Sequence, residues 1–99
     1  MPHLKWTDNS IRGVQKVYRF LAQYDLEAAK AAVRTIKGKA DILKKQPRAG
    51  RPTDDLDLDH RELVIPFGAS GYVLIYEVYE DYILILAVKH QKEAGYELN

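Results

Sequence analysis

The chain has no cysteine and no long apolar run. Without cysteine it cannot form disulfides or cysteine-ligated zinc sites, and this composition fits a reducing compartment such as the cytoplasm. No window approaches the roughly 18 apolar residues of a membrane span, and the first ten residues, MPHLKWTDNS, do not have the pattern of a signal peptide. We therefore expect a cytoplasmic protein that does not enter the membrane.

An excess of either charge is also absent. The chain carries 15 Lys and Arg against 14 Asp and Glu, a formal net charge of +1. This balance excludes a molecule that is drawn to nucleic acid as a whole, so any basic site must be local. With 99 residues the chain has room for one domain, residues 1–99, and for one modest core.

Common cofactor and metal motifs are missing as well. There is no phosphate loop, no nucleophile elbow and no dinucleotide fingerprint. The three histidines, at positions 3, 60 and 90, lack metal-ligand spacing, and the acidic run DDLDLD lacks the glycine and the final glutamate of a calcium loop. We predict no metal site and no cofactor.

The first half of the chain has the spacing of two helices. A short edge strand is expected at His3–Trp6, and Asp8, Asn9 or Ser10 is expected to cap the first helix. Its apolar stripe is Ile11, Val14, Val17 or Tyr18, and Leu21. Asp25 should cap a second helix, whose stripe is Leu26, Ala29, Val33, Ile36, Ala40 and Leu43. The short connection QYD predicts an antiparallel helical hairpin.

The second half changes to the alternation of strands. Residues 47–60 contain two prolines, a glycine and four aspartates and should form a loop. Strands are then expected at 61–67, 72–79 and 82–90. Pro66 places the first of these strands at an edge or a bulge, because proline cannot donate to a ladder. Two helices followed by an antiparallel sheet predict an α+β domain with the helices on one sheet face.

The last of these strands, ILILAV from residue 83 to residue 88, is apolar on both faces. We therefore expect it to be central, or to be covered on one face by the helices and on the other by something else, for which a partner chain is the natural candidate. Strict alternation puts His90 on the face of Leu84, Leu86 and Val88. The same alternation puts Lys89 on the face of Ile83, Ile85 and Ala87.

Polar residues gather where this strand ends, at Lys89, His90, Gln91 and Lys92, with Tyr96 just beyond. His90 has two interpretations: a general acid or base, or a hydrogen-bonded residue at the rim of the sheet. A second basic group contains Arg48, Arg51, His60 and Arg61. Arginines of this kind recognise phosphate or carboxylate, but the aspartates of the loop can also neutralise them.

The segment from Arg61 to Tyr96, RELVIPFGASGYVLIYEVYEDYILILAVKHQKEAGY, resembles the C-terminal half of the RelE/ParE superfamily, the toxins of bacterial type II toxin–antitoxin systems. The upstream order agrees, with a short strand, a helical hairpin and the motif P-R-x-G-R-P at 47–52. GYVLIYEV and ILAVKHQ are the most specific parts. The resemblance implies a four-stranded antiparallel sheet with the hairpin on one face. It also implies an antitoxin that lays an extended, partly helical segment across the toxin and supplies the missing cover.

The superfamily has two activities. RelE-like members cleave mRNA in the ribosome with basic residues on the sheet and a tyrosine near the C-terminus. The resemblance implies as the corresponding catalytic set Arg61, Lys89, His90, Lys92 and Tyr96. However, Val73 stands after GY where the ribonucleases commonly have arginine, and Glu62 stands where a lysine would help and would repel phosphate. Such catalysis needs cations beside the phosphate.

ParE-like members instead bind and poison DNA gyrase, and their last strand often ends in HQ, as His90-Gln91 does here. The missing strand cations favour this interpretation, with the ribosome-dependent endoribonuclease as the alternative. The residues expected to bind the target are Arg48, Arg51, Arg61, His90 and Gln91. A third interpretation is a decayed toxin that persists as a binding module for an antitoxin.

Overall fold

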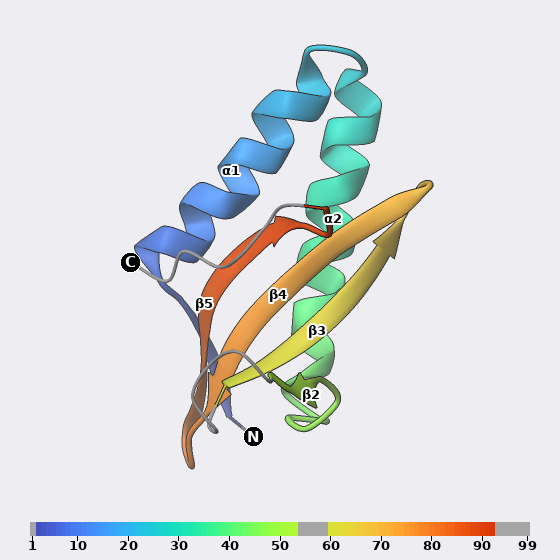
Figure 1. Cartoon of the computed structure of the whole chain (residues 1–99). Helices are drawn as coiled ribbons and strands as arrows, with labels where there is room; N and C mark the ends of the chain where they lie inside the picture. Colours follow the sequence, from blue (N-terminus) through green and yellow to red (C-terminus); the bar gives the residue numbers. More distant parts are fainter. Residues whose placement is uncertain (1, 54–59, 93–99) are drawn as a thin grey trace.

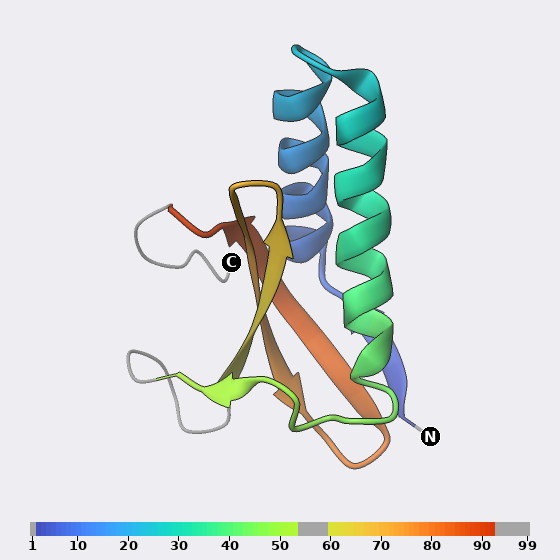
Figure 2. The ribbon, with the colours of Figure 1, turned by 90° about the vertical axis from the view of Figure 1, so that its right-hand side faces the viewer.

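A computed structural model, described for residues 2–53 and 60–92, shows two helices packed on one side of a sheet (Figures 1 and 2). The elements in chain order are β1 (His3–Trp6), α1 (Asp8–Ala22), α2 (Leu26–Ile42), β2 (Arg51–Pro52), β3 (His60–Phe67), β4 (Ser70–Val78) and β5 (Tyr82–His90). This confirms the predicted α+β arrangement of a helical hairpin on a sheet. No helix in the described ranges is long and apolar enough to cross a membrane.

The sheet has five strands in the order β1-β5-β4-β3-β2, and one pair of them is parallel. The expectation of a four-stranded, entirely antiparallel sheet was therefore wrong in strand number and in the direction of that pair. β3, β4 and β5 form the antiparallel meander that was predicted. β1 pairs with β5 in parallel, with His3 opposite Tyr82. The two strands run in the same direction, and the helices and the other three strands lie between them in the chain (Figure 1). β2 pairs only two residues of β3, which leaves Pro66 on a free edge, as its missing N–H predicted.

Both helices begin at a capping side chain. Thr7 caps α1, one residue before the three predicted candidates, and its Oγ accepts the backbone N–H of Ser10. Thr7 is favoured as the cap because its hydroxyl also donates a 2.8 Å hydrogen bond to the carbonyl of Ile85. This bond fixes the start of α1 against β5. Asp25 caps α2 as predicted, accepting the N–H groups of Glu27 and Ala28.

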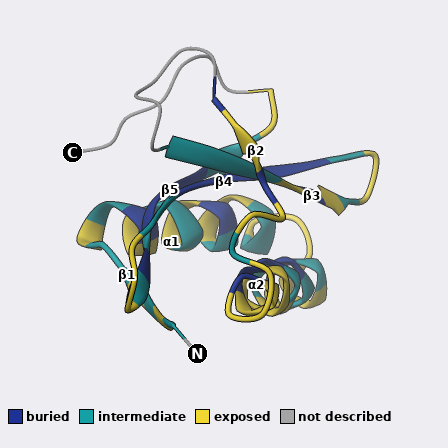
Figure 3. Cartoon of the chain, turned by 90° about the horizontal axis from the view of Figure 1, so that it is seen from below, coloured by how far each residue is buried: buried dark blue, intermediate teal, exposed yellow. Residues whose placement is uncertain are grey.

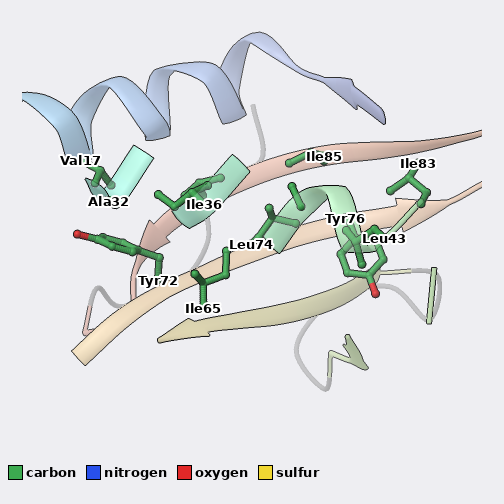
Figure 4. Packing of buried hydrophobic residues seen from close by; sticks show 12 residues of the cluster. Val17, Ala32, Ile36, Leu43, Ile65, Tyr72, Leu74, Tyr76, Ile83 and Ile85 are labelled. Carbon is green, nitrogen blue, oxygen red and sulfur yellow. The ribbon is translucent and has the colours of Figure 1, made fainter. Parts of the chain in front are cut away.

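The main core lies between the helices and the sheet (Figure 4). β5 is central, between β1 and β4, as its continuous apolar run predicted. Ile36 of α2, Leu74 of β4 and Ile85 of β5 are completely buried here. Gly13 lets α1 approach β5 closely, because a Cβ at this position would lie only 2.4 Å from the carbonyl oxygen of Val88.

A β-bulge in β5 breaks the alternation on which the prediction for its side chains depended. Ile75 pairs with Ala87 but the next residue of β4, Tyr76, pairs with Ile85, so Leu86 is an extra residue. Ile83, Ile85 and Val88 face the helices, whereas Leu86 and Ala87 belong to a separate cluster on the other face. The prediction that grouped Val88 with Leu86, and Ala87 with Ile85, was therefore wrong.

The second face of the sheet is also less open than expected. Val73, Ile75, Leu86 and Ala87 pack together there, and each is less than a tenth exposed in the chain alone. A partner chain is thus not needed to bury them. The large apolar side chains that remain most exposed lie on the helical hairpin instead, where Phe20 is 59% and Tyr24 76% exposed.

Candidate functional site

His90 leaves β5 on the helix side of the sheet, because the bulge has already shifted the register. Its ring meets the edge of Tyr72, with the centroids 5.7 Å apart. Nδ1 accepts the backbone N–H of Lys92 at 3.1 Å, and Nε2 lies 2.9 Å from Oγ of Ser70. Since Nδ1 is an acceptor, the neutral ring carries its proton on Nε2 and donates it to Ser70.

A groove of about 620 Å³ lies beside His90, between α1 and the turn that joins β3 to β4. Its lining is mostly apolar, and the principal side chains are Val17, Phe20, Leu21, Phe67 and Tyr72. Burial raises the pKa of Tyr72, so its hydroxyl keeps its proton at neutral pH. Lys16 and Lys92 add positive charge to the lining. The groove fits an apolar side chain with an acidic neighbour.

Sequence reasoning did not find this groove. Phe20 lies outside the predicted apolar stripe of α1, and Phe67 and Tyr72 lie in the strands predicted at 61–67 and 72–79, with no site role assigned to them. The sequence nevertheless indicates an additional apolar surface on α1. Phe20 is adjacent to Leu21 and makes the apolar face of the helix wider than the stripe that packs on the core.

A second polar group lies where β2 meets β3. Nη1 of Arg61 donates to the carbonyl of Gly50 at 2.8 Å, and Arg51 Nε lies 2.6 Å from Oε1 of Glu62. The hydroxyl of Tyr76 accepts the N–H of Gly50, also at 2.8 Å. Burial raises the pKa of Tyr76, against the opposing effects of the Gly50 N–H bond and the charge of Arg61. Tyr76 therefore holds this loop as a neutral hydrogen-bonding group.

The predicted site residues fall into separate groups. His90 and Lys92 lie together at the groove, and the exposed Gln91 lies between them, its backbone N–H donating to the carbonyl of Gly71. Arg61 is opposite Tyr76 and His90 is opposite Tyr72, four positions apart on β4 or about 13 Å along the strand.

The remaining predicted residues lie away from the groove. Lys89 is opposite Val73, on the second face of the sheet. Arg48 is exposed near Arg51, at the end of the molecule that holds Arg61. Tyr96 and the loop aspartates at 54, 55, 57 and 59 lie outside the described residues. The catalytic set therefore does not converge on one point within residues 2–53 and 60–92.

His60 lies apart from the other basic residues of its predicted group, on the second face, with Nε2 3.6 Å from Oε1 of Glu77. In the part of the chain that the structure describes, no three potential ligands gather to hold a metal ion.

Comparison with known proteins identifies the fold. A family model described as the ParE toxin of the type II toxin–antitoxin system parDE matches residues 4–95. Toxin RelE3 of Caulobacter vibrioides is 35% identical over 82 residues, which cover 83% of this chain and 86% of that protein. A solved chain of the chromosomal ParDE system of P. aeruginosa superposes with a TM-score of 0.77 at 24% identity, covering 91% of this chain and 96% of that one.

The fold and these matches define a toxin of a type II toxin–antitoxin system. The chain belongs to the ParE toxin family, within the RelE/ParE superfamily. Its partner is accordingly an antitoxin.

Proposed function

We propose that this toxin arrests bacterial growth in the cytoplasm by binding and inhibiting DNA gyrase. The observation that supports this most directly is the separation of its cations. Arg61 is bonded to Gly50, Lys89 lies on the opposite sheet face, and His90 is engaged by Ser70 and Lys92. Cleavage of a phosphodiester needs such groups to converge on the phosphate, whereas inhibition by binding does not.

Two surfaces are proposed to contact the target. One is the arginine group at β2, where Arg48 and Arg51 are exposed and Arg61 fixes the backbone between them. The other is the end of β5, with His90 and Gln91. Arginine at the centre of a protein interface commonly contributes much of the binding energy.

The antitoxin is proposed to neutralise the toxin by placing an apolar segment in the groove beside His90. Phe20 is more than half exposed here in the free toxin, and burying an aromatic side chain of this kind contributes about 2 kcal/mol. Lys16 and Lys92 favour acidic residues flanking that segment. An antitoxin in this position covers His90 and thereby blocks one of the two proposed target surfaces.

The test is a supercoiling assay with purified toxin and purified gyrase, run beside a cleavage assay on ribosome-bound mRNA with the same protein. We expect supercoiling to stop at toxin excess and the mRNA to remain intact. Toxin mixed first with its antitoxin serves as the control and should leave gyrase active. Intact supercoiling together with discrete cuts at A-site codons would reverse the assignment.

Ribosome-dependent endoribonuclease activity is the second candidate, and the similarity to Toxin RelE3 favours it. In that case His90 and Lys92, which share the groove, would act on the scissile phosphate together with Arg61, Lys89 and Tyr96. The mRNA cleavage assay tests this directly. Expression without the antitoxin tests the third candidate, because a decayed toxin would not arrest growth.

A further inference from the structure

The charge of this nearly neutral chain is unevenly divided between its two layers. From Asp8 to Lys45, the region that contains both helices, the sequence has nine Lys and Arg against four Asp and Glu, a net charge of +5. The whole chain carries +1, so the remaining residues carry a net charge of −4. The helical layer is therefore basic, a property that the overall charge hides.

Part of this charge lies on one outward surface. α1 turns Ser10 and Val17 toward the sheet, and the helical period then places Arg12 and Arg19 on its opposite side. In the same way α2 buries Ala29, Ala32, Ile36 and Ala40 and turns outward Lys30, Arg34 and Lys37. The outward side of α2 is visibly exposed in Figure 3.

The cations of α1 lie beside those of α2. Arg19 of α1 lines a shallow groove between the helices together with Val33 of α2, which directly precedes Arg34. All five side chains are exposed. We call this surface the basic face, defined by Arg12, Arg19, Lys30, Arg34 and Lys37.

Most of the basic face has no counter-charge of its own. Lys30 is 3.9 Å from Glu27, a long and exposed pair that contributes little. Within residues 2–53 and 60–92, no ion pair or hydrogen bond involves the side chains of Arg12, Arg19, Arg34 or Lys37. Charges of this kind gain free energy when they meet an anion and release its counterions.

The side chains between the cations indicate which anion this is. Ala31 and Thr35 separate the basic residues of α2, and the apolar side chains that line the shallow groove beside them, Val14, Tyr18 and Val33, are only partly exposed. From Lys30 to Lys37 the row runs about 10 Å at 1.5 Å per residue. That length matches about three steps of a nucleic-acid strand at 3.4 Å per step. A regular polyanion fits such a row better than a protein does.

We propose that the basic face binds the phosphate backbone of duplex DNA, so that the toxin contacts the DNA held by gyrase as well as the enzyme. This inference rests on the proposed target, because gyrase is what brings the toxin to DNA. The contact is independent of sequence, since the cations reach phosphates and not base edges. None of the five residues of the basic face lines the groove beside His90 or belongs to the arginine group at β2.

The experiment measures binding of the purified toxin to a fluorescent 25-base-pair duplex of arbitrary sequence by anisotropy, over a series of salt concentrations. Binding should weaken steeply with salt. Replacing Arg34→Gln and Lys37→Gln together should lower the slope of log affinity against log salt by about 1.8, near 0.9 for each lost phosphate contact. The matched control is Lys5→Gln with Lys39→Gln, two exposed cations outside the basic face, and it should leave the slope near the wild-type value.

Three results would overturn the proposal: no salt-dependent binding by the wild-type toxin, an equal loss in the control, or tighter binding to RNA duplex than to DNA. A double variant that keeps its DNA affinity but loses antitoxin would assign the face to the antitoxin and would also overturn it. Circular dichroism should show both double variants folded, because all four residues are exposed and, within the described part of the chain, Lys5 alone has a contact to lose, with Nζ 4.3 Å from the ring centroid of Tyr82. Failure of the DNA contact is distinguishable from failure of the gyrase assignment. A toxin that stops supercoiling but does not bind free duplex DNA refutes only the DNA contact.

Discussion

The buried hydroxyl of Tyr76 accepts a 2.8 Å hydrogen bond from the backbone N–H of Gly50, and it donates one of equal length to the carbonyl of Pro47. One side chain on β4 thereby fixes both ends of the turn that carries Arg48. No larger residue can replace Gly50 without movement, because a Cβ there would lie 2.7 Å from that hydroxyl. The position of the arginine group thus depends on a phenol at the centre of the sheet.

Removing that hydroxyl should weaken the fold. Tyr76→Phe leaves the buried N–H of Gly50 without its partner, which should lower the free energy of unfolding by about 1–3 kcal/mol. Tyr72→Phe is the matched control, since the hydroxyl of Tyr72 makes no hydrogen bond within the described residues, and it should cost less than about 0.5 kcal/mol. Urea denaturation measures both. Equal losses would mean that the bond to Gly50 adds nothing.

Two helical glycines should respond in opposite directions to the same substitution. Gly13→Ala puts a methyl group against the carbonyl of Val88 and should destabilise by about 1–3 kcal/mol, because α1 must move off β5. Gly38 has no atom within 4 Å of the added Cβ, so Gly38→Ala should stabilise by up to about 1 kcal/mol through helix propensity. Thermal unfolding of the two variants compares them directly. A stabilising Gly13→Ala would show that the helix and strand are not in close contact.

Stability should fall at alkaline pH because of Tyr72 and Tyr76. Burial raises the pKa of both above the ordinary value of 10.0, so the unfolded chain loses these protons first. Their contribution is fully present below about pH 10 and is lost as the pH rises through their raised pKa values in the folded state. Urea unfolding at intervals from pH 8 to pH 11 should show the decline. The decline should be smaller in the double variant with both tyrosines replaced by phenylalanine, and an unchanged decline would contradict the assignment to Tyr72 and Tyr76.

His90 should matter for toxicity without mattering for folding. Half-buried beside the groove, it contacts the ring of Tyr72, Oγ of Ser70 and the backbone of Lys92 at the very end of β5. His90→Ala is expected to relieve growth arrest on induction while the helix and strand content seen by circular dichroism stays unchanged. His3→Ala, at an exposed position on β1, is the control and should remain toxic. If His90→Ala arrests growth as fully as the wild type, the end of β5 is not a target surface.

The sequence predicted most elements because their signals are local. The period of the apolar stripes, the cap at Asp25 and the missing N–H of Pro66 each act within a few residues. The cap of α1 was misplaced because Thr7, Asp8, Asn9 and Ser10 are all capping residues, and the contact of Thr7 with Ile85 decides among them. That contact joins residues 78 positions apart, which no local pattern reports.

The bulge at Leu86 could not be predicted for a different reason. Six apolar residues in a row have no alternation that can be read, so a shift of one position leaves no trace in the sequence. The candidate site depended on that register, because the bulge puts residues 87–90 on the opposite faces, relative to residues 83–86, from those that strict alternation predicts. The separation of Arg61 from His90 was hidden as well, since it follows from pairing across three strands.

The parallel pairing of β1 with β5 has a consequence for the newborn chain. His3 and its partner Tyr82 are 79 positions apart, so β1 waits roughly 4–16 s for β5 at ordinary translation speeds. During that interval the helical hairpin lacks the central strand of the sheet on which it packs, and the end of β5 has not been synthesised. The sheet can therefore close only after β5 has been synthesised, and the end of β5 that we propose as a target surface forms at the same step.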